Sequence, residues 1–245
     1  MDHFAETEKL AASIFAQNGC EQYTVLLPRF SAFGDLLLRE NEKHNLTAIR
    51  SAEDVWLRHF ADCLLFADFF NTRATLIDVG CGGGFPSVPL ALACPALKVT
   101  ACDSTKKKTD FVSLAAQTLA LENLRTLCAR AEEAGKSPVW RERFDFASAR
   151  AVSALPALAE YCLPLVRVGG CFAAFKGKDA EVELAAAEPM IANLGGKTDR
   201  ILHKTLLAPD GEAIERSLII IRKIRPTPAV FPRKNSVIQR EKTRT

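Results

Sequence analysis

Apolar residues in the first 70 positions recur at intervals of three and four, which is the period of a helix with one buried face. Three such runs pass through Ile14, Phe33 and Phe60. Ser51 and Asp54, three positions apart, resemble a capping box at the start of the third run. We therefore predict a helical N-terminal cap over residues 1–72.

The pattern changes at residue 74, where short apolar runs begin to alternate with longer helical ones. Strand, helix, strand in regular succession is typical of a parallel sheet with helices on both faces. The predicted fold class is α/β, a Rossmann-like, doubly wound, mostly parallel sheet over residues 73–223, compact with the N-terminal helical extension. A tail over residues 224–245 follows. The strands are expected at 74–79, 97–102, 124–129, 144–149, 169–176 and 216–224.

Size and composition indicate an ordinary globular protein. The chain has 245 residues, 48% of them hydrophobic, which is enough for one sizeable core. No apolar stretch reaches the roughly 20 residues that span a bilayer, and the acidic start lacks the features of a secretory signal. Eight cysteines are scattered without a C-x-x-C pair or a histidine cluster, which argues against a zinc site or a disulfide framework. We expect a cytoplasmic protein without a membrane anchor or a metal.

Positive charge is concentrated at the C-terminal end. From residue 222 onward the chain has eight Lys or Arg against one Glu, whereas the net charge of the whole chain is +3. Such a segment indicates either a contact with a polyanion or a solvated, partly disordered tail. The sequence leaves both interpretations open.

A glycine-rich loop follows the first expected strand, in the stretch LIDVGCGGGFPSVPL over residues 76–90. In open α/β sheets the ligand binds at the carboxyl ends of the strands, commonly at this loop. The dinucleotide fingerprint G-x-G-x-x-G fails in both registers, because a phenylalanine or a serine stands where the third glycine is required. The spacing that fits is D-x-G-x-G-x-G, formed by Asp78, Gly80, Gly82 and Gly84, and it resembles the first motif of the S-adenosylmethionine-dependent methyltransferases.

Two acidic residues follow at the ends of the next two strands. Asp103 ends the second strand, where a carboxylate can accept hydrogen bonds from both hydroxyls of a ribose. Asp103 could instead cap the helix that follows, and we favour the ribose because the glycine loop lies one strand earlier. Glu132, after the third strand, lies where the edge of an adenine is expected, and its other interpretation is a solvated acid at a helix start.

A set of motifs distributed along the chain gives a more specific indication. The segments HNLTAI (44–49), RHFADC (58–63), DVGCGGGFPSVPLAL, DSTKKKTDF, RAEE (130–133), FDFASARAVSALPAL and VFPRK (230–234) occur in this order. In the content and order of these segments the chain resembles the RsmG family, also called GidB. The resemblance implies a class I methyltransferase that transfers a methyl group from S-adenosylmethionine to N7 of a guanine in 16S ribosomal RNA.

The resemblance also implies roles for individual residues. It places contacts to S-adenosylmethionine at Gly80, Phe85, Ala131, Glu132 and Arg150, to which the loop and strand arguments add Gly82, Gly84 and Asp103. The candidates for RNA contact are Arg58, His59, Lys107, Lys108, Lys176, Arg233 and Lys234.

Some of these roles have alternatives. His59 also suits a packed, hydrogen-bonded position, and Lys176 also suits the position of a solvated lysine at a strand end.

The expected partner is 16S rRNA in the small ribosomal subunit, with the protein acting as a monomer. The family usually continues PRK with Gly-x-Pro-x-Lys-x-Pro, whereas this chain has NSVIQREKT. Truncation after Ile221 is expected to weaken RNA binding and to leave cofactor binding almost unchanged.

The sequence shows no catalytic dyad. It has neither an Asn-Pro-Pro-Tyr-like tetrapeptide for an exocyclic amine nor a Pro-Cys pair for attack on a pyrimidine ring. Guanine N7 carries a lone pair and no proton, so its methylation needs no general base. Holding the two reactants in line can lower the activation barrier by roughly 7 to 11 kcal/mol. The alternatives to an rRNA methyltransferase are an NAD-dependent oxidoreductase on the same fold and a non-catalytic RNA-binding protein.

Overall fold

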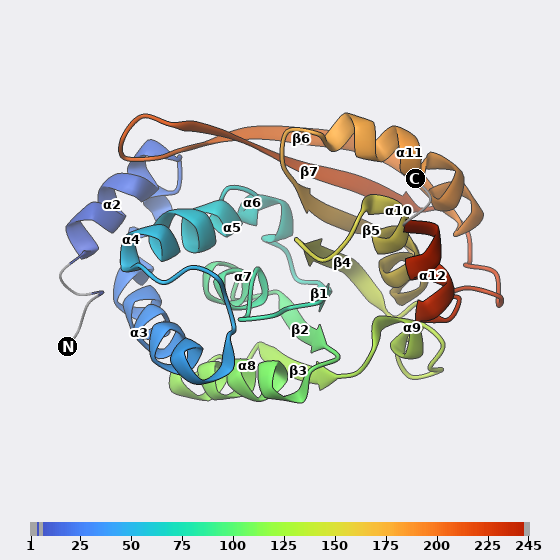
Figure 1. Cartoon of the computed structure of the whole chain (residues 1–245), viewed down its shortest axis with the longest axis horizontal. Coiled ribbons are helices and arrows are strands. Elements are labelled where there is room, and N and C mark those ends of the chain that lie inside the picture. Colours follow the sequence, from blue (N-terminus) through green and yellow to red (C-terminus); the bar gives the residue numbers. More distant parts are fainter. Residues whose placement is uncertain (1–3, 5–6, 243–245) are drawn as a thin grey trace.

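A seven-stranded sheet forms the centre of the molecule in the computed structural model, which describes residue 4 and residues 7–242 (Figure 1). The strand order is β3-β2-β1-β4-β5-β7-β6. Strands β1 to β5 pair in parallel, whereas β7 is antiparallel to β5 and β6 is antiparallel to β7. The strands are β1 (Thr75–Val79), β2 (Lys98–Asp103), β3 (Leu124–Cys128), β4 (Phe144–Arg150), β5 (Val166–Lys176), β6 (Gly196–Leu207) and β7 (Ala213–Lys223).

The predicted fold class is confirmed, with one strand added. Strand β6 was not among the strands expected from the sequence, because most of its side chains are exposed or half-buried and it has no continuous apolar face. It lies at the edge of the sheet, where a strand can be polar on both faces. The hairpin of β6 and β7 reaches over the sheet to α2 (Glu8–Gln17), where Asn18 exchanges two hydrogen bonds with the backbone of Leu207 (Figure 1).

Helices cover both faces of the sheet. The helices on the first face, from the N-terminal region and the first two crossovers, share one core with the sheet, and α10, α11 and α12 share the core of the second face. No helix in the described part of the chain is long and apolar enough to cross a membrane. The remaining helices are η1 (Glu21–Leu26), α3 (Leu27–His44), α4 (Ala52–Val55), η2 (Trp56–Ala61), α5 (Asp62–Leu64), α6 (Ala67–Phe70), α7 (Ser87–Ala93), α8 (Lys106–Thr118), α9 (Ala131–Ala134), α10 (Leu155–Cys162), η3 (Leu163–Leu165), α11 (Ala180–Asn193) and α12 (Asn235–Lys242).

Aromatic rings join the N-terminal helices to the sheet. The ring of Phe33 in α3 lies 5.8 Å from Phe60, 5.5 Å from Phe85 in the glycine loop and 6.2 Å from Phe111 in α8, between ring centroids. Such pairs stabilise a core beyond the area they bury. The N-terminal segment is therefore packed into the same core as the sheet.

The third predicted helix contains a widened turn. Its start is as expected, because the hydroxyl of Ser51 accepts a hydrogen bond from the backbone N–H of Asp54 (3.1 Å) and donates to its carboxylate (2.9 Å). The sequence periodicity predicted a regular helix beyond this point, but η2 has π-helical hydrogen bonding. Turns of this kind are frequent at functional sites, and this one contains His59.

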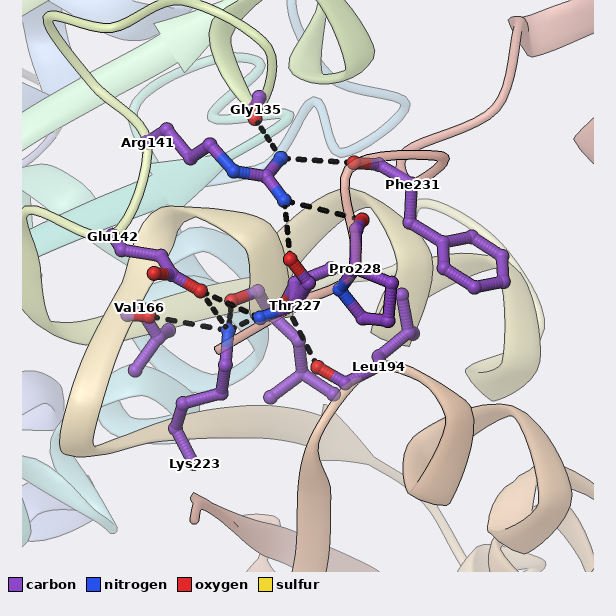
Figure 2. A network of polar contacts seen from close by, with 10 residues as sticks. Gly135, Arg141, Glu142, Val166, Leu194, Lys223, Thr227, Pro228 and Phe231 are labelled. Atoms are coloured by element: carbon purple, nitrogen blue, oxygen red, sulfur yellow. Dashed lines mark hydrogen bonds and ion pairs between the residues drawn. The ribbon is translucent and has the colours of Figure 1, made fainter. Parts of the chain in front are cut away.

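Interior polar groups fix the path of the chain after β7 (Figure 2). Lys223 is fully buried, and its ammonium donates to the hydroxyl of Thr227 (2.5 Å) and forms an ion pair with Glu142 (3.1 Å). The guanidinium of Arg141 donates to the carbonyl oxygens of Thr227 (2.7 Å) and Phe231 (2.8 Å). Satisfied buried polar groups of this kind order a segment that has little apolar periodicity.

The interpretation of the tail over residues 224–245 as solvated and partly disordered does not hold for residues 224–242, and residues 243–245 lie outside the described part of the chain. Arg233 forms an ion pair with Glu160, which is fully buried, at 2.7 Å, and the chain then enters α12. Arg222 and Lys223, which contribute to the positive charge of this region, are paired with Asp199 and Glu142. The surface around the tail is less basic than the sequence count suggests, because the carboxylates of Glu160, Glu142 and Asp199 neutralise part of that charge.

Candidate cofactor site

A cavity of about 650 Å³ opens at the carboxyl ends of the parallel strands. This is where open α/β sheets bind their ligands, and the volume suits a molecule of cofactor size. The walls come from the loops after β1, β2, β3 and β4, from the segment 46–48, from η2 and α10, and from α12. The cavity is therefore assembled from both ends of the chain around the glycine loop.

The glycine loop forms the floor of the cavity. Gly80 and Gly82 have φ angles of +77° and +53°, which L-residues with a side chain rarely adopt. A Cβ atom on Gly82 would meet no protein atom closer than the oxygen of Gly80 at 3.9 Å, so it would occupy cavity space. Gly84 lies behind the loop, where a Cβ would come within 2.8 Å of Val88 in α7. Gly80, Gly82 and Phe85 thus line the cavity, and Gly84 supports the loop from the α7 side.

Asp103 joins the loop to the end of β2. Its carboxylate accepts hydrogen bonds from the backbone N–H groups of Gly82 (3.1 Å) and Thr105 (2.9 Å), one on each oxygen. Helix α8 begins after Thr105, so Asp103 lies outside the cap position that the alternative interpretation required. The residue is almost completely buried and lines the cavity. Each of its oxygens retains a lone pair for a further donor.

Asp78, the acid of the glycine motif, is an internal residue. It is fully buried at the end of β1, and its carboxylate accepts hydrogen bonds from Ser87 (2.5 Å) and Ser148 (3.0 Å). Burial raises the pKa of Asp78 to about 6. The Asp78 carboxylate therefore ties β1 to α7 and β4 and holds the loop in place.

The edge of the cavity beyond β3 contains the expected pair Ala131 and Glu132 at the start of α9. Three further side chains line the same cavity, namely Tyr161 from α10 and Asn235 and Gln239 from α12. Nothing in the sequence alone indicated the last two. Truncation after Ile221, which the sequence predicted to leave cofactor binding almost unchanged, would remove Asn235 and Gln239 from the cavity wall.

Arg150 lies at the end of β4 on the opposite side of the cavity. Its guanidinium donates to Asp62 (2.8 Å), to Nδ1 of His59 (2.8 Å) and to the carbonyl oxygen of Arg58 (3.1 Å). It also lies over the ring of Phe85, 5.4 Å from the centroid. These contacts fix the guanidinium from several sides, so it can present its charge to a ligand without losing side-chain entropy.

His59 is a neutral, fixed member of this side of the cavity. Its ring stacks on Phe85 with centroids 4.0 Å apart, and Nε2 lies 2.8 Å from the hydroxyl of Thr47. Because Arg150 donates to Nδ1, the hydrogen-bond network assigns the proton to Nε2. Burial, and then the charge of Arg150, lower the pKa of His59 to about 3. The imidazole therefore stays uncharged at neutral pH with both nitrogens engaged.

Two residues that hold this side of the cavity, Asp62 and Arg216, were not singled out from the sequence. Asp62 accepts hydrogen bonds from both Arg150 and Arg216, the latter reaching in from β7 at 2.5 Å. Asp62 stands inside the motif RHFADC, which gave a signal, whereas Arg216 is separated from it by most of the chain and gave none. The Asp62 carboxylate therefore connects α5, β4 and β7 behind the cavity.

The candidates for RNA contact are found in different environments. Arg58, Lys107 and Lys234 are exposed, and Arg58 forms an ion pair with Asp54 at 3.1 Å. Lys108 lines the cavity 3.6 Å from Asp103.

The other candidates are held inside the fold. Lys176 is largely buried and pairs with Glu183 at 2.6 Å, while Arg233 is held by Glu160. His59 is buried against Phe85. RNA contact by any of these seven residues stays a prediction, and the exposed three are the most accessible to a phosphate.

Comparison with known proteins identifies related chains along nearly the whole length. The family model described as GidB, rRNA small subunit methyltransferase G, matches residues 27–207. The ribosomal RNA small subunit methyltransferase G of Acetivibrio thermocellus is 43% identical over 210 residues, covering 85% of each chain. The protein of the same name from an Exiguobacterium species is 44% identical over 218 residues, covering 88% of this chain and 90% of its own.

Solved structures share the fold at much lower sequence identity. YcgJ of Bacillus subtilis has a TM-score of 0.50 at 14% identity, covering 69% of this chain and all of its own. A SAM-dependent methyltransferase of Aquifex aeolicus has a TM-score of 0.50 at 17% identity, covering 68% of this chain and 92% of its own. These likenesses confirm the architecture of the sheet domain. The family model and the relatives above 40% identity show that this chain belongs to the GidB family of rRNA small subunit methyltransferase G proteins.

Proposed function

We propose that this protein transfers a methyl group from S-adenosylmethionine to N7 of a guanine in the 16S rRNA of the small ribosomal subunit, by direct transfer without a covalent intermediate. Membership of the GidB family supports the reaction class and the RNA, as do the relatives named for small-subunit rRNA methylation. The observation that carries the proposal at the site is the cavity at the ends of β1, β2 and β3, where a glycine loop and Asp103 face the same space.

The residues of the cavity fit the parts of S-adenosylmethionine. The lone pairs that Asp103 retains suit the two ribose hydroxyls, and the space above Gly82 admits a ligand against the backbone. Ala131 and Glu132 lie where an apolar wall and an acceptor for the adenine amine are needed. When bound, S-adenosylmethionine supplies an electrophilic methyl group on its sulfonium.

The surroundings of His59 favour an acceptor that needs no general base. His59 is held neutral with both ring nitrogens engaged, so the imidazole has no free lone pair with which to remove a proton. Guanine N7 has an in-plane lone pair and no proton to lose. For such an acceptor the protein has to hold the two reactants in line and exclude water, which oriented side chains such as Arg150 and Phe85 can do.

The test of this function is methyl transfer with a mapped product. Purified protein is incubated with tritiated S-adenosylmethionine and 16S rRNA, either naked or in assembled small subunits, and the labelled guanine is mapped by borohydride and aniline cleavage. We expect label at one guanine that becomes cleavable, in at least one of the two substrates. Label that resists this cleavage would exclude N7 as the acceptor. Absence of label in both would contradict the proposal, and NAD binding in its place would favour the oxidoreductase alternative.

Replacing Asp103 by asparagine tests the ribose contact. We expect the affinity for S-adenosylmethionine to fall by about 1 to 3 kcal/mol, since a charged acceptor of buried hydrogen bonds is lost. Asp110→Asn is the matched control, because that carboxylate is exposed on α8 and pairs with Lys106. Calorimetric titration measures both variants. A lower melting temperature with unchanged affinity in Asp103→Asn would assign the residue a purely structural role.

A further inference from the structure

Helix α12 closes the cavity on the side of α9 and α10. Asn235 and Gln239 are four positions apart, so they lie on the same face of the helix, and both line the cavity together with Ala131 and Glu132. Figure 1 shows α12 lying beside α10 near α9. Residues 235–239 are thus the part of the tail that reaches the cofactor cavity.

This position of α12 is held by the interior of the protein. Ile238, on the inner face of the helix, is 2% exposed and belongs to the core of the second sheet face. Just before the helix, Arg233 donates to both oxygens of the buried Glu160. Arg141 and Lys223 fix the preceding turn (Figure 2). The helix is therefore a built wall of the cavity.

A hydroxyl orders the two side chains that face the ligand space. Tyr161 donates to Oδ1 of Asn235 (2.6 Å) and accepts from Nε2 of Gln239 (2.9 Å). Burial raises the pKa of Tyr161, so its hydroxyl keeps the proton that it donates. This network sets the orientation of the Asn235 amide. No described residue accepts a hydrogen bond from its amide nitrogen, and Oδ1 retains a second lone pair.

A side-chain amide with these free groups matches the edge of an adenine. Asn and Gln pair in bidentate fashion with adenine, accepting from the exocyclic amine and donating to the neighbouring ring nitrogen. The charges along this wall are mixed, because Glu132 and Arg130 both line it, while Arg233 and Lys223 are paired with Glu160 and Glu142.

We infer that α12 is part of the cofactor pocket and that Asn235, oriented by Tyr161, recognises the adenine of S-adenosylmethionine. This inference rests on the proposed function, because it takes S-adenosylmethionine to be the ligand of the cavity. It assigns the atypical tail of this chain to cofactor specificity, separate from any contact that exposed residues such as Lys234 make with RNA.

The experiment compares two ligands that differ only in the base. S-Adenosylhomocysteine and S-inosylhomocysteine, in which an oxo group replaces the adenine amine, are titrated calorimetrically into the full-length protein and its variants. We expect wild-type protein to prefer the adenine ligand. Asn235→Ala should bind it about tenfold more weakly and lose most of the preference, and Tyr161→Phe should show a smaller loss of the same kind. Ser236→Ala, an exposed position on the same helix, is the matched control and should behave as wild type.

The outcomes separate the inference from the function on which it rests. If wild-type protein binds S-adenosylhomocysteine and Asn235→Ala retains both affinity and preference, the adenine contact is wrong while the proposed function stands. If wild-type protein binds neither ligand, both are wrong. Asn235→Ala could weaken binding simply by loosening α12. Hydrogen exchange of the α12 backbone amides is therefore measured as a second, independent readout. In wild-type protein we expect S-adenosylhomocysteine to slow this exchange, and unchanged exchange would overturn the assignment of α12 to the pocket.

Discussion

Gly82→Val is expected to lower the affinity for S-adenosylmethionine by about 100-fold or more while the protein still folds. The Cβ atom of residue 82 would meet only the oxygen of Gly80, at 3.9 Å, so it would fit against the protein and extend into the ligand space. The left-handed φ of +53° adds a stability cost of about 1 to 2 kcal/mol, which the fold can absorb. Calorimetric titration and thermal unfolding measure the two effects separately.

Gly19→Val supplies the matched control for this prediction. Gly19 has a φ of +63° and a Cβ on it would have nothing within 4 Å, so the backbone strain is comparable, but the residue lies in the turn after α2. We expect the two variants to lose similar stability and only Gly82→Val to lose cofactor affinity. Equal affinity in both would show that the loop is not the cofactor contact. Gly80→Val should be harsher to the fold, because its Cβ would lie 2.6 Å from Val152.

The sequence predicted the parts of this protein that depend on local pattern. The alternation of strands and helices indicated the parallel sheet, and the spacing of Gly80 and Gly82 predicted the glycine loop that lines the cavity at the end of β1. Asp103 was found because parallel strands end at one edge, so that acids at successive strand ends converge. In each case the signal lies within one or two neighbouring elements of the chain.

The parts that the sequence did not predict depend on contacts between distant segments. Asn235 and Gln239 lie in a stretch of low apolar periodicity, and only the burial of Ile238 and the pair of Arg233 with Glu160 bring them to the cavity. Charge counting likewise treats Lys223 as part of a basic tail, because a sequence gives no sign of the carboxylate that pairs with it inside the fold. Both errors arise from tertiary contacts that override local composition.

Asp62, on the Arg150 side of the cavity, also owes its role to contacts between segments that are distant in the sequence. It is 7% exposed and is the shared carboxylate between Arg150 of β4 and Arg216 of β7, so its removal would deprive both guanidinium groups of their paired negative charge. Arg150 then loses one of the contacts that hold it over Phe85. Removing one partner of a buried ion pair costs more stability than the pair contributed, because the remaining charge stays buried without compensation.

Asp62→Ala is therefore expected to lower the free energy of unfolding by about 3 kcal/mol and the methyl-transfer rate by about 100-fold. Asp54→Ala is the control, because that exposed carboxylate pairs with the exposed Arg58 on the same helical segment and should contribute less than about 1 kcal/mol. Arg216→Met distinguishes the two roles of Asp62, since it removes one arm of the network and keeps the pair of Asp62 with Arg150. We expect it to lower stability, measured by urea unfolding, and to leave most of the rate. If Arg216→Met and Asp62→Ala reduce stability and rate in the same proportion, Asp62 stabilises the fold without positioning Arg150 for the reaction.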